Sequence, residues 1–207
     1  MALVNRSKTT KEECLGILKS FYKFLLFPIL VFVGVEMLLT RESLNVYFFF
    51  TVWILIFASI WIFIYRAKSR LRRLKKIVSN LKKTEYFCPD RLSESYQQVA
   101  GRYMGIDANN GTILYVHLIR KGIVDIVGLT MEDWTNREVE GKLFRLYTKN
   151  PELPRIEIAT PWAQRWYDTL GAMEHKQYSP PRPFAEYVRG HIEALERDNS
   201  IHIPKIA

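Results

Sequence analysis

The sequence predicts an α+β protein built from an N-terminal two-helix transmembrane hairpin, a small antiparallel β-sheet that an amphipathic helix caps, and a C-terminal helix. Three observations predict this class. Two apolar runs lie before residue 66, and a strongly basic stretch follows the second run. After residue 98, short segments rich in β-branched and aromatic residues alternate with tight-turn residues, as the strands of an antiparallel sheet do.

The two apolar runs are suited to a pair of transmembrane helices. The second run, Val46–Tyr65, has twenty residues without a charge. About twenty residues, rising ~1.5 Å each, match a hydrocarbon core of about 30 Å. The first run, Phe21–Leu39, contains Pro28 and Gly34, and taken alone it also fits a re-entrant or interfacial helix. Because only residues 40–45 separate the runs, we expect a tight hairpin with both helices in the membrane.

Glu36 is the only acidic residue in these two runs. An intramembrane carboxylate can take part in proton or ion transfer. The alternative is that Glu36 lies within one turn of the loop and reaches water. We prefer the alternative, because one acid in a two-helix anchor provides no pathway.

Basic residues flank the hairpin on one side. Residues 66–83 contain nine Lys and Arg and no acid, and the residues before the first run are also basic, so the positive-inside rule predicts cytoplasmic termini. The net charge of +9 divides into +11 for residues 1–83 and −2 for residues 84–207. The basicity therefore lies beside the membrane, which indicates anionic lipids as a partner and argues against nucleic acid.

The basic stretch also has helical periodicity, because Leu71, Leu74, Ile77, Val78 and Leu81 fall on one face. We favour a helical stalk that continues the second apolar run, with this face packed on the domain or paired with another copy in a homodimer. The alternatives are a helix lying on anionic lipid and an arm that binds calmodulin or nucleic acid. The residues expected to contact lipid head groups are Arg66, Lys68, Arg70, Arg72, Arg73, Lys75 and Lys76.

Residues 84–98 are expected to form a linker, since Pro89 interrupts any helix. In the strand region that follows, Asn110-Gly111 is a strong hairpin signal, because both residues accept positive φ. The expected strands are Val99–Asp107, Thr112–Ile119, Ile123–Leu129, Trp134–Val139, Lys142–Thr148 and Arg155–Ala159. Alternation predicts core positions at Ile113 or Leu114, Val116, Ile126, Leu143, Leu146, Ile156 and Ile158.

Two helices are expected after the sheet. Thr160-Pro161 has the pattern of an N-cap followed by proline at the first helical position. The helix Trp162–Glu174 then carries an apolar stripe of Trp162, Trp166, Leu170 and Met173. Residues 179–183 (SPPRP) suit a stiff spacer better than a polyproline ligand. The second helix, Phe184–Asp198, has an expected face of Phe184, Tyr187 or Val188, Ile192 and Leu195.

These elements define the expected domain organisation. It consists of a cytoplasmic segment (1–20), the hairpin (21–65, with helices 21–39 and 46–65), a basic juxtamembrane helix (66–83), a linker (84–98), the sheet with its capping helix (99–176), and a proline-rich linker with the last helix and tail (177–207).

The sequence carries no signature of catalysis or metal binding. It lacks the HExxH, GxSxG, P-loop and GxGxxG motifs, and its two cysteines are far apart, so we expect no enzyme, no cofactor and reduced thiols. The acidic pair Glu132-Asp133 fits a solvated turn better than a metal site. Trp134 and Arg137 beside it are candidate partner-binding residues, because Trp and Arg are enriched in binding hot spots. Trp134 equally suits the core.

Tyr103–Met173 resembles bacterial pleckstrin-homology-like domains. YMGIDANNGTILYV is similar to their first hairpin, GIVDIVGLTMEDWTNREV to the strand, acidic turn, Trp and strand that follow, and WAQRWYDTLGAM to their closing helix. Together with the apolar hairpin, the layout of the whole chain resembles the Exc-type entry-exclusion proteins of conjugative plasmids of the I and L/M groups.

This resemblance implies a protein of the bacterial inner membrane in a recipient cell. Such a protein blocks redundant conjugative transfer by recognising an inner-membrane protein of the donor's conjugation machine, a type IV secretion system. The family offers no motif that would transfer a site residue by residue. The alternative is an inner-membrane regulatory or lipid-associated protein that is unrelated to conjugation.

Overall fold

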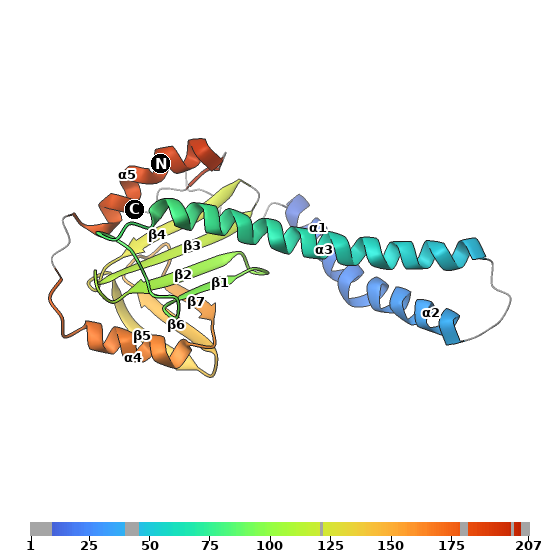
Figure 1. The fold of residues 1–207 in the computed structure, drawn as a ribbon, viewed down its shortest axis with the longest axis horizontal. Helices are drawn as coiled ribbons and strands as arrows, with labels where there is room; N and C mark the ends of the chain where they lie inside the picture. The colour runs from blue at the N-terminus through green and yellow to red at the C-terminus, as the bar shows by residue number, and fades with distance from the viewer. Residues whose placement is uncertain (1–9, 40–45, 121, 179–181, 200, 204–207) are drawn as a thin grey trace. The chain divides into compact units, whose positions relative to one another are not determined.

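The computed structural model describes residues 10–39, 46–120, 122–178, 182–199 and 201–203 (Figure 1). The α+β class is confirmed, since two long apolar helices precede two antiparallel sheets. The chain divides after Arg66 into two compact units. The start of the N-terminal segment, the loop 40–45 and most of the SPPRP spacer lie outside the described residues.

The described residues of the first unit, 10–39 and 46–66, are all helical. The helices are α1 (Thr10–Phe21), the π-helical turn η1 (Tyr22–Leu26), α2 (Phe27–Leu39) and the first part of α3 (Val46–Leu81). In η1 the Phe27 N–H bonds the Tyr22 carbonyl, five residues earlier. Pro28 explains this turn, because its ring clashes with the carbonyl four residues before it and it has no N–H to donate.

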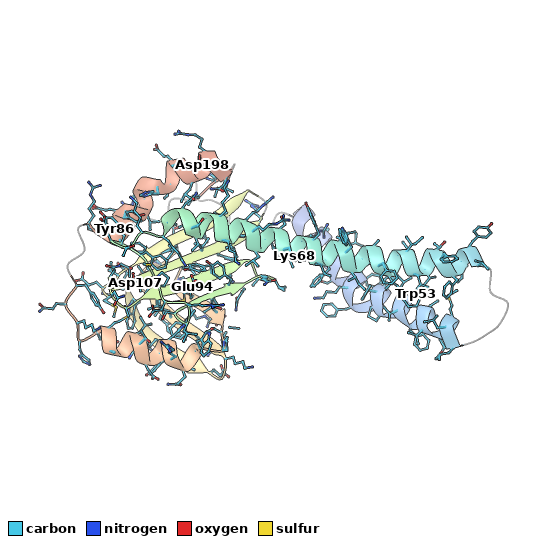
Figure 2. All side chains as sticks on the ribbon, viewed as in Figure 1. Trp53, Lys68, Tyr86, Glu94, Asp107 and Asp198 are labelled. Carbon is cyan, nitrogen blue, oxygen red and sulfur yellow. The ribbon has the colours of Figure 1, made fainter. Side chains whose placement is uncertain are left out.

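A small buried cluster of Met37, Val52 and Ile56 joins α2 to α3, with Trp53 packed beside it (Figure 2). Gly34 allows this approach, since a Cβ at that position would lie 3.0 Å from Ile56 Cδ1. Among the described residues, 25 of the 28 exposed large hydrophobic side chains belong to this unit. By length and composition, the helices Gly16–Leu39 and Val46–Leu81 are each sufficient to cross a membrane.

The second unit contains two antiparallel sheets with strand orders β1-β2-β3-β4 and β5-β6-β7. The strands are β1 (Glu94–Gln97), β2 (Arg102–Asp107), β3 (Thr112–Arg120), β4 (Ile123–Leu129), β5 (Trp134–Glu140), β6 (Leu143–Thr148) and β7 (Arg155–Ala159). The expected turn at Asn110-Gly111 is present, a second turn lies at Glu140-Gly141, and both glycines have positive φ (70° and 57°).

The prediction of a single antiparallel sheet is wrong. The chain changes sheets between β4 and β5, where the Asp133 carboxylate accepts hydrogen bonds from both the backbone N–H and the hydroxyl of Thr130 at 2.7 Å. The linker prediction for residues 84–98 missed β1, whose sequence ESYQ lacks apolar alternation. The strand expected from Val99 begins instead at Arg102, because a turn ending at Gly101 (φ 69°) precedes it.

The β1–β4 sheet is buried on both faces. One face packs against α3 and α5 (Phe184–Asn199), and the other packs against the β5–β7 sheet and α4 (Ala163–Met173), as Figure 1 shows. This explains why both Ile113 and Leu114 are fully buried, where alternation required a choice between them. The α3 side chains in this core are Leu74, Ile77, Val78 and Leu81.

Three sequence-based details required correction. Helix α4 begins at Ala163, and Trp162 is 40% exposed, because the Thr160 hydroxyl accepts a hydrogen bond from the Trp162 N–H in a turn before the helix. Leu143 is only half-buried. Alternation along β6 instead turns its neighbour Phe144 inward together with Leu146.

We expect Ile77→Ala to lower the free energy of unfolding of the second unit by about 2–5 kcal/mol, since a cavity forms where α3 meets the sheet. Asn80→Ala, at an exposed position of the same helix, should change it by less than about 0.5 kcal/mol. Urea unfolding of the detergent-solubilised chain, followed by tryptophan fluorescence, measures both. Equal stability of the two variants would contradict this packing.

Candidate partner-binding surface

Strand β5 forms one edge of the three-stranded sheet. Its register pairs Arg137 with Leu146 and Val139 with Phe144, both of which are buried, so the side chains of Arg137 and Val139 point to the inner side. Glu138 and Glu140 alternate with them and point to the outer side. The edge strand therefore presents two chemically different rows of side chains.

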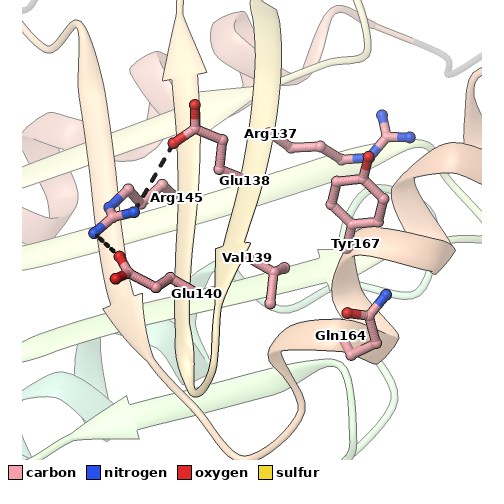
Figure 3. A pocket seen from close by; sticks show the side chains of 7 residues that line it. All are labelled: Arg137, Glu138, Val139, Glu140, Arg145, Gln164 and Tyr167. Atoms are coloured by element: carbon pink, nitrogen blue, oxygen red, sulfur yellow. Dashed lines mark hydrogen bonds and ion pairs between the residues drawn. The ribbon is translucent and has the colours of Figure 1, made fainter.

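An open pocket of about 440 Å³ runs beside this edge, between β5 and α4 (Figure 3). The pocket is lined by four consecutive β5 residues, by Arg145 of β6, and by two α4 residues one turn apart. These residues are Arg137, Glu138, Val139, Glu140, Arg145, Gln164 and Tyr167. The contribution from α4 was not predicted, because Gln164 and Tyr167 lie outside the apolar stripe of this helix.

Arg137 is held in place by aromatic and acidic neighbours. Its guanidinium lies 4.6 Å from the Tyr167 ring centre and 5.5 Å from that of Trp134, and it forms an ion pair with Glu174. Gly171 of α4 provides the space, because a Cβ there would lie 2.8 Å from an Arg137 terminal nitrogen. Such stacking stabilises by roughly 0.5–2 kcal/mol, depending on desolvation.

The structure brings together the two residues that the sequence singled out, and both are largely covered. Trp134 is 7% exposed and belongs to the core between the sheets, which favours the structural role considered for it. The Arg137 side chain is 14% exposed. A direct contact of either residue with a partner stays a prediction.

The outer face of the same sheet carries a charge network centred on Arg145. This residue lies directly opposite Glu138 on β5 and Glu157 on β7, and it also pairs with Glu140. Its hydrogen bond to Glu140 raises the pKa of Arg145, and the bond that Tyr147 donates to Glu138 raises the pKa of Tyr147. The Arg145 guanidinium therefore forms ion pairs with three carboxylates.

The seven basic residues expected at the lipid surface are all exposed on α3. Two of them also form hydrogen bonds within the second unit, because Arg70 donates to the Val99 carbonyl at 2.6 Å and Lys76 to that of Asp198 at 3.1 Å. The lipid contact itself stays a prediction. Periodicity could identify the apolar face of this helix, but it could not reveal these backbone acceptors.

Asp133 of the acidic pair Glu132-Asp133 has a structural role, because its carboxylate accepts two hydrogen bonds from Thr130. Within the described ranges, no three His, Cys, Asp or Glu side chains are grouped to hold a metal ion. Cys14 and Cys88 are both free.

A family model for exclusion-determining proteins matches residues 2–207, which is almost the whole chain. The chain belongs to this family. Membership supports a role in plasmid entry exclusion, and the family is not known for enzymatic activity. No curated protein and no solved structure matches the chain.

In this member of the exclusion-determining family, a cluster around Glu94 joins the end of α3 to the sheet (Figure 2). One Glu94 oxygen accepts from Lys82 Nζ at 2.6 Å and from the Tyr103 hydroxyl at 3.0 Å. Tyr96 packs on Tyr103, with ring centres 4.6 Å apart. Burial, and then the Glu94 charge, raise the pKa values of both Tyr96 and Tyr103 above the ordinary value of 10.0.

Because the folded state keeps Tyr103 protonated, its contribution to stability is complete below pH 10 and is lost as the pH rises above it. We expect Tyr103→Phe to cost about 1–3 kcal/mol at neutral pH, since Glu94 loses a hydrogen-bond donor. The variant should also flatten the alkaline loss of stability. Urea unfolding between neutral pH and pH 11 tests this, and the same alkaline slope in both proteins would contradict it.

Proposed function

We propose that this protein is a membrane-anchored interaction module that recognises a protein of the donor's conjugation machine and thereby blocks redundant transfer into a cell carrying the same plasmid. The match to the exclusion-determining family over residues 2–207 carries this proposal. Two apolar helices and a separate domain with an exposed edge strand fit an anchor that presents a recognition surface.

The proposed location is the bacterial inner membrane, with both termini in the cytoplasm. The charge distribution supports this topology, because the basic residues lie before the first apolar run and after the second. The proposed partner is an inner-membrane protein of a type IV secretion system. No cofactor or nucleic acid enters the proposal, and a homodimer is an additional assembly to test.

We further propose that the second unit is a pleckstrin-homology-like domain of an exclusion protein of the I or L/M plasmid groups. A four-stranded and a three-stranded antiparallel sheet, closed by α4, support the domain assignment. In this proposal the partner contacts the region around Trp134 and Arg137. Arg137 is the more accessible of the two and lines the open pocket.

The test is the frequency of conjugation into recipients that produce this protein. We expect fewer transconjugants than with an empty vector when the donor carries a related plasmid, and no change for an unrelated plasmid. Arg137→Gln should weaken exclusion, whereas Arg165→Gln, at an exposed α4 position outside the pocket, should not. Undiminished transfer of every related plasmid would contradict the proposed function.

The exposed basic residues of α3 support a second role at anionic lipid, independent of conjugation. Residues 66–207 should bind phosphatidylglycerol vesicles, and the binding should weaken steeply as salt rises, because the Debye length shortens. Changing Arg66, Lys68, Arg70, Arg72, Arg73, Lys75 and Lys76 to Gln should remove most of it, at about 1 kcal/mol per charge. Co-sedimentation measures this binding, and salt-independent binding would argue against the role.

A further inference from the structure

We propose that the partner of the groove between β5 and α4 is an extended peptide segment that adds to β5 as a new strand and alternates basic with apolar side chains. This inference rests on the proposed function, because the segment would belong to the protein whose recognition causes exclusion. That segment would carry basic and apolar side chains, and it would bind at the edge of β5.

The backbone of β5 supplies the first argument. In the described part of the chain, the sheet order ends at β5, so its outer N–H and C=O groups have no neighbouring strand. Such an edge is a template for another strand. Helix α4 stands beside this edge without closing it, since the open pocket of about 440 Å³ lies between them (Figure 3).

The inner row of side chains selects apolar residues. A strand added to β5 would turn alternate side chains toward Val139 and the α4 residues Gln164 and Tyr167. Tyr167 is 36% exposed and Val139 is half-buried, so both present apolar surface to the groove. The other α4 residue, Gln164, is already bonded to Asp168 at 3.0 Å, which leaves Tyr167 as the main contact.

The outer row selects basic residues. Glu138 and Glu140 are spaced two apart on β5, with side chains 46% and 73% exposed. Arg145 pairs with both glutamates and with Glu157, which also pairs with Arg155, and Tyr147 donates to Glu138. Three carboxylates thus face two guanidinium groups, which leaves an excess of one negative charge at this edge. Directly opposed opposite charges stabilise paired strands. Lys or Arg at alternate positions of the added strand would lie beside these two carboxylates.

A second copy of this chain is a poorer occupant of the same edge. Antiparallel pairing of β5 with itself, centred on Val139, would place Glu138 opposite Glu140 on both sides of the symmetry axis. Like charges directly opposite each other destabilise paired strands. The charge pattern therefore favours a different, basic partner.

The probe for testing this is a fluorescent peptide of about seven residues that alternates lysine and valine, the length of an ordinary strand. It is titrated onto the full chain in a zwitterionic detergent, and binding is read by anisotropy. We expect saturable binding, weakened about tenfold or more when glutamate replaces lysine. Two further peptides carry N-methyl groups, each on one of the two alternating sets of backbone nitrogens. Methylation of the set that faces β5 should abolish binding, and methylation of the other set should not.

Matched variants locate the site. Glu138→Gln with Glu140→Gln should weaken peptide binding about tenfold, whereas Glu186→Gln with Glu193→Gln, at exposed positions of α5, should leave it within about twofold. Tyr167→Ala should weaken binding, and Arg165→Ala on the same helix should not. Equal affinity of the test and control variants would overturn the proposal, as would insensitivity to N-methylation or no binding at millimolar peptide.

Sedimentation of the full chain provides the test for the competing occupant. Self-association of the unaltered chain that strengthens in the Glu138→Gln and Glu140→Gln variant, where the like-charge contacts are relieved, would assign the edge to a second copy and overturn the peptide proposal.

Conjugation assays with the same variants separate the two proposals. If these variants lose peptide binding but still exclude the plasmid, the groove is not the exclusion contact, although the proposed function stands. If the unaltered chain excludes no related plasmid, the proposed function fails, whatever the peptide result. Loss of both peptide binding and exclusion in the test variants alone is the expected result.

Discussion

The second unit depends on the contact between the apolar face of α3 and the β1–β4 sheet. A sheet with an inner face on β5–β7 would otherwise expose Leu114, Val116 and Ile126 to water on its other face. Leu74 and Ile77 cover these residues, at 0% and 1% exposure. Each buried aliphatic side chain stabilises by roughly 1.5–3 kcal/mol, so the helix is part of the fold of this unit.

The polar contacts of α3 then determine where the helix lies on the sheet. Apolar burial has little directional preference, whereas the hydrogen bonds of Lys82 with Glu94 and of Arg70 with the Val99 carbonyl fix position. The two faces of one helix therefore have different tasks. The buried apolar face of α3 stabilises the unit. Its basic face positions the helix through these hydrogen bonds and also exposes a row of positive charges.

The sequence was sufficient for the features that depend on local chemistry. Asn110-Gly111 identified a hairpin because its backbone preference is intrinsic, and Ile77 was placed on the apolar face of its helix by periodicity alone. The division into two sheets was missed, since it depends on how Asp133 bonds across a turn. The groove could not be predicted from the sequence either, because only tertiary packing places Tyr167 beside the edge strand. Trp134 and Arg137 were found through composition, and the core alternative given for Trp134 agrees with its 7% exposure. The covering of Arg137 was not predicted, because it depends on Tyr167 and Glu174 of α4.

The glutamates of β5 have a consequence for crowding. The proposed membrane anchor would confine the second unit to a thin layer, where the effective concentration of neighbouring copies is far above that in solution. At such a concentration, an unpaired strand edge promotes edge-to-edge aggregation of identical molecules. Glu138 and Glu140 would repel the same strand of the next copy. An edge that binds a basic partner segment but repels β5 of identical copies would stay unpaired at high surface density until the partner segment binds.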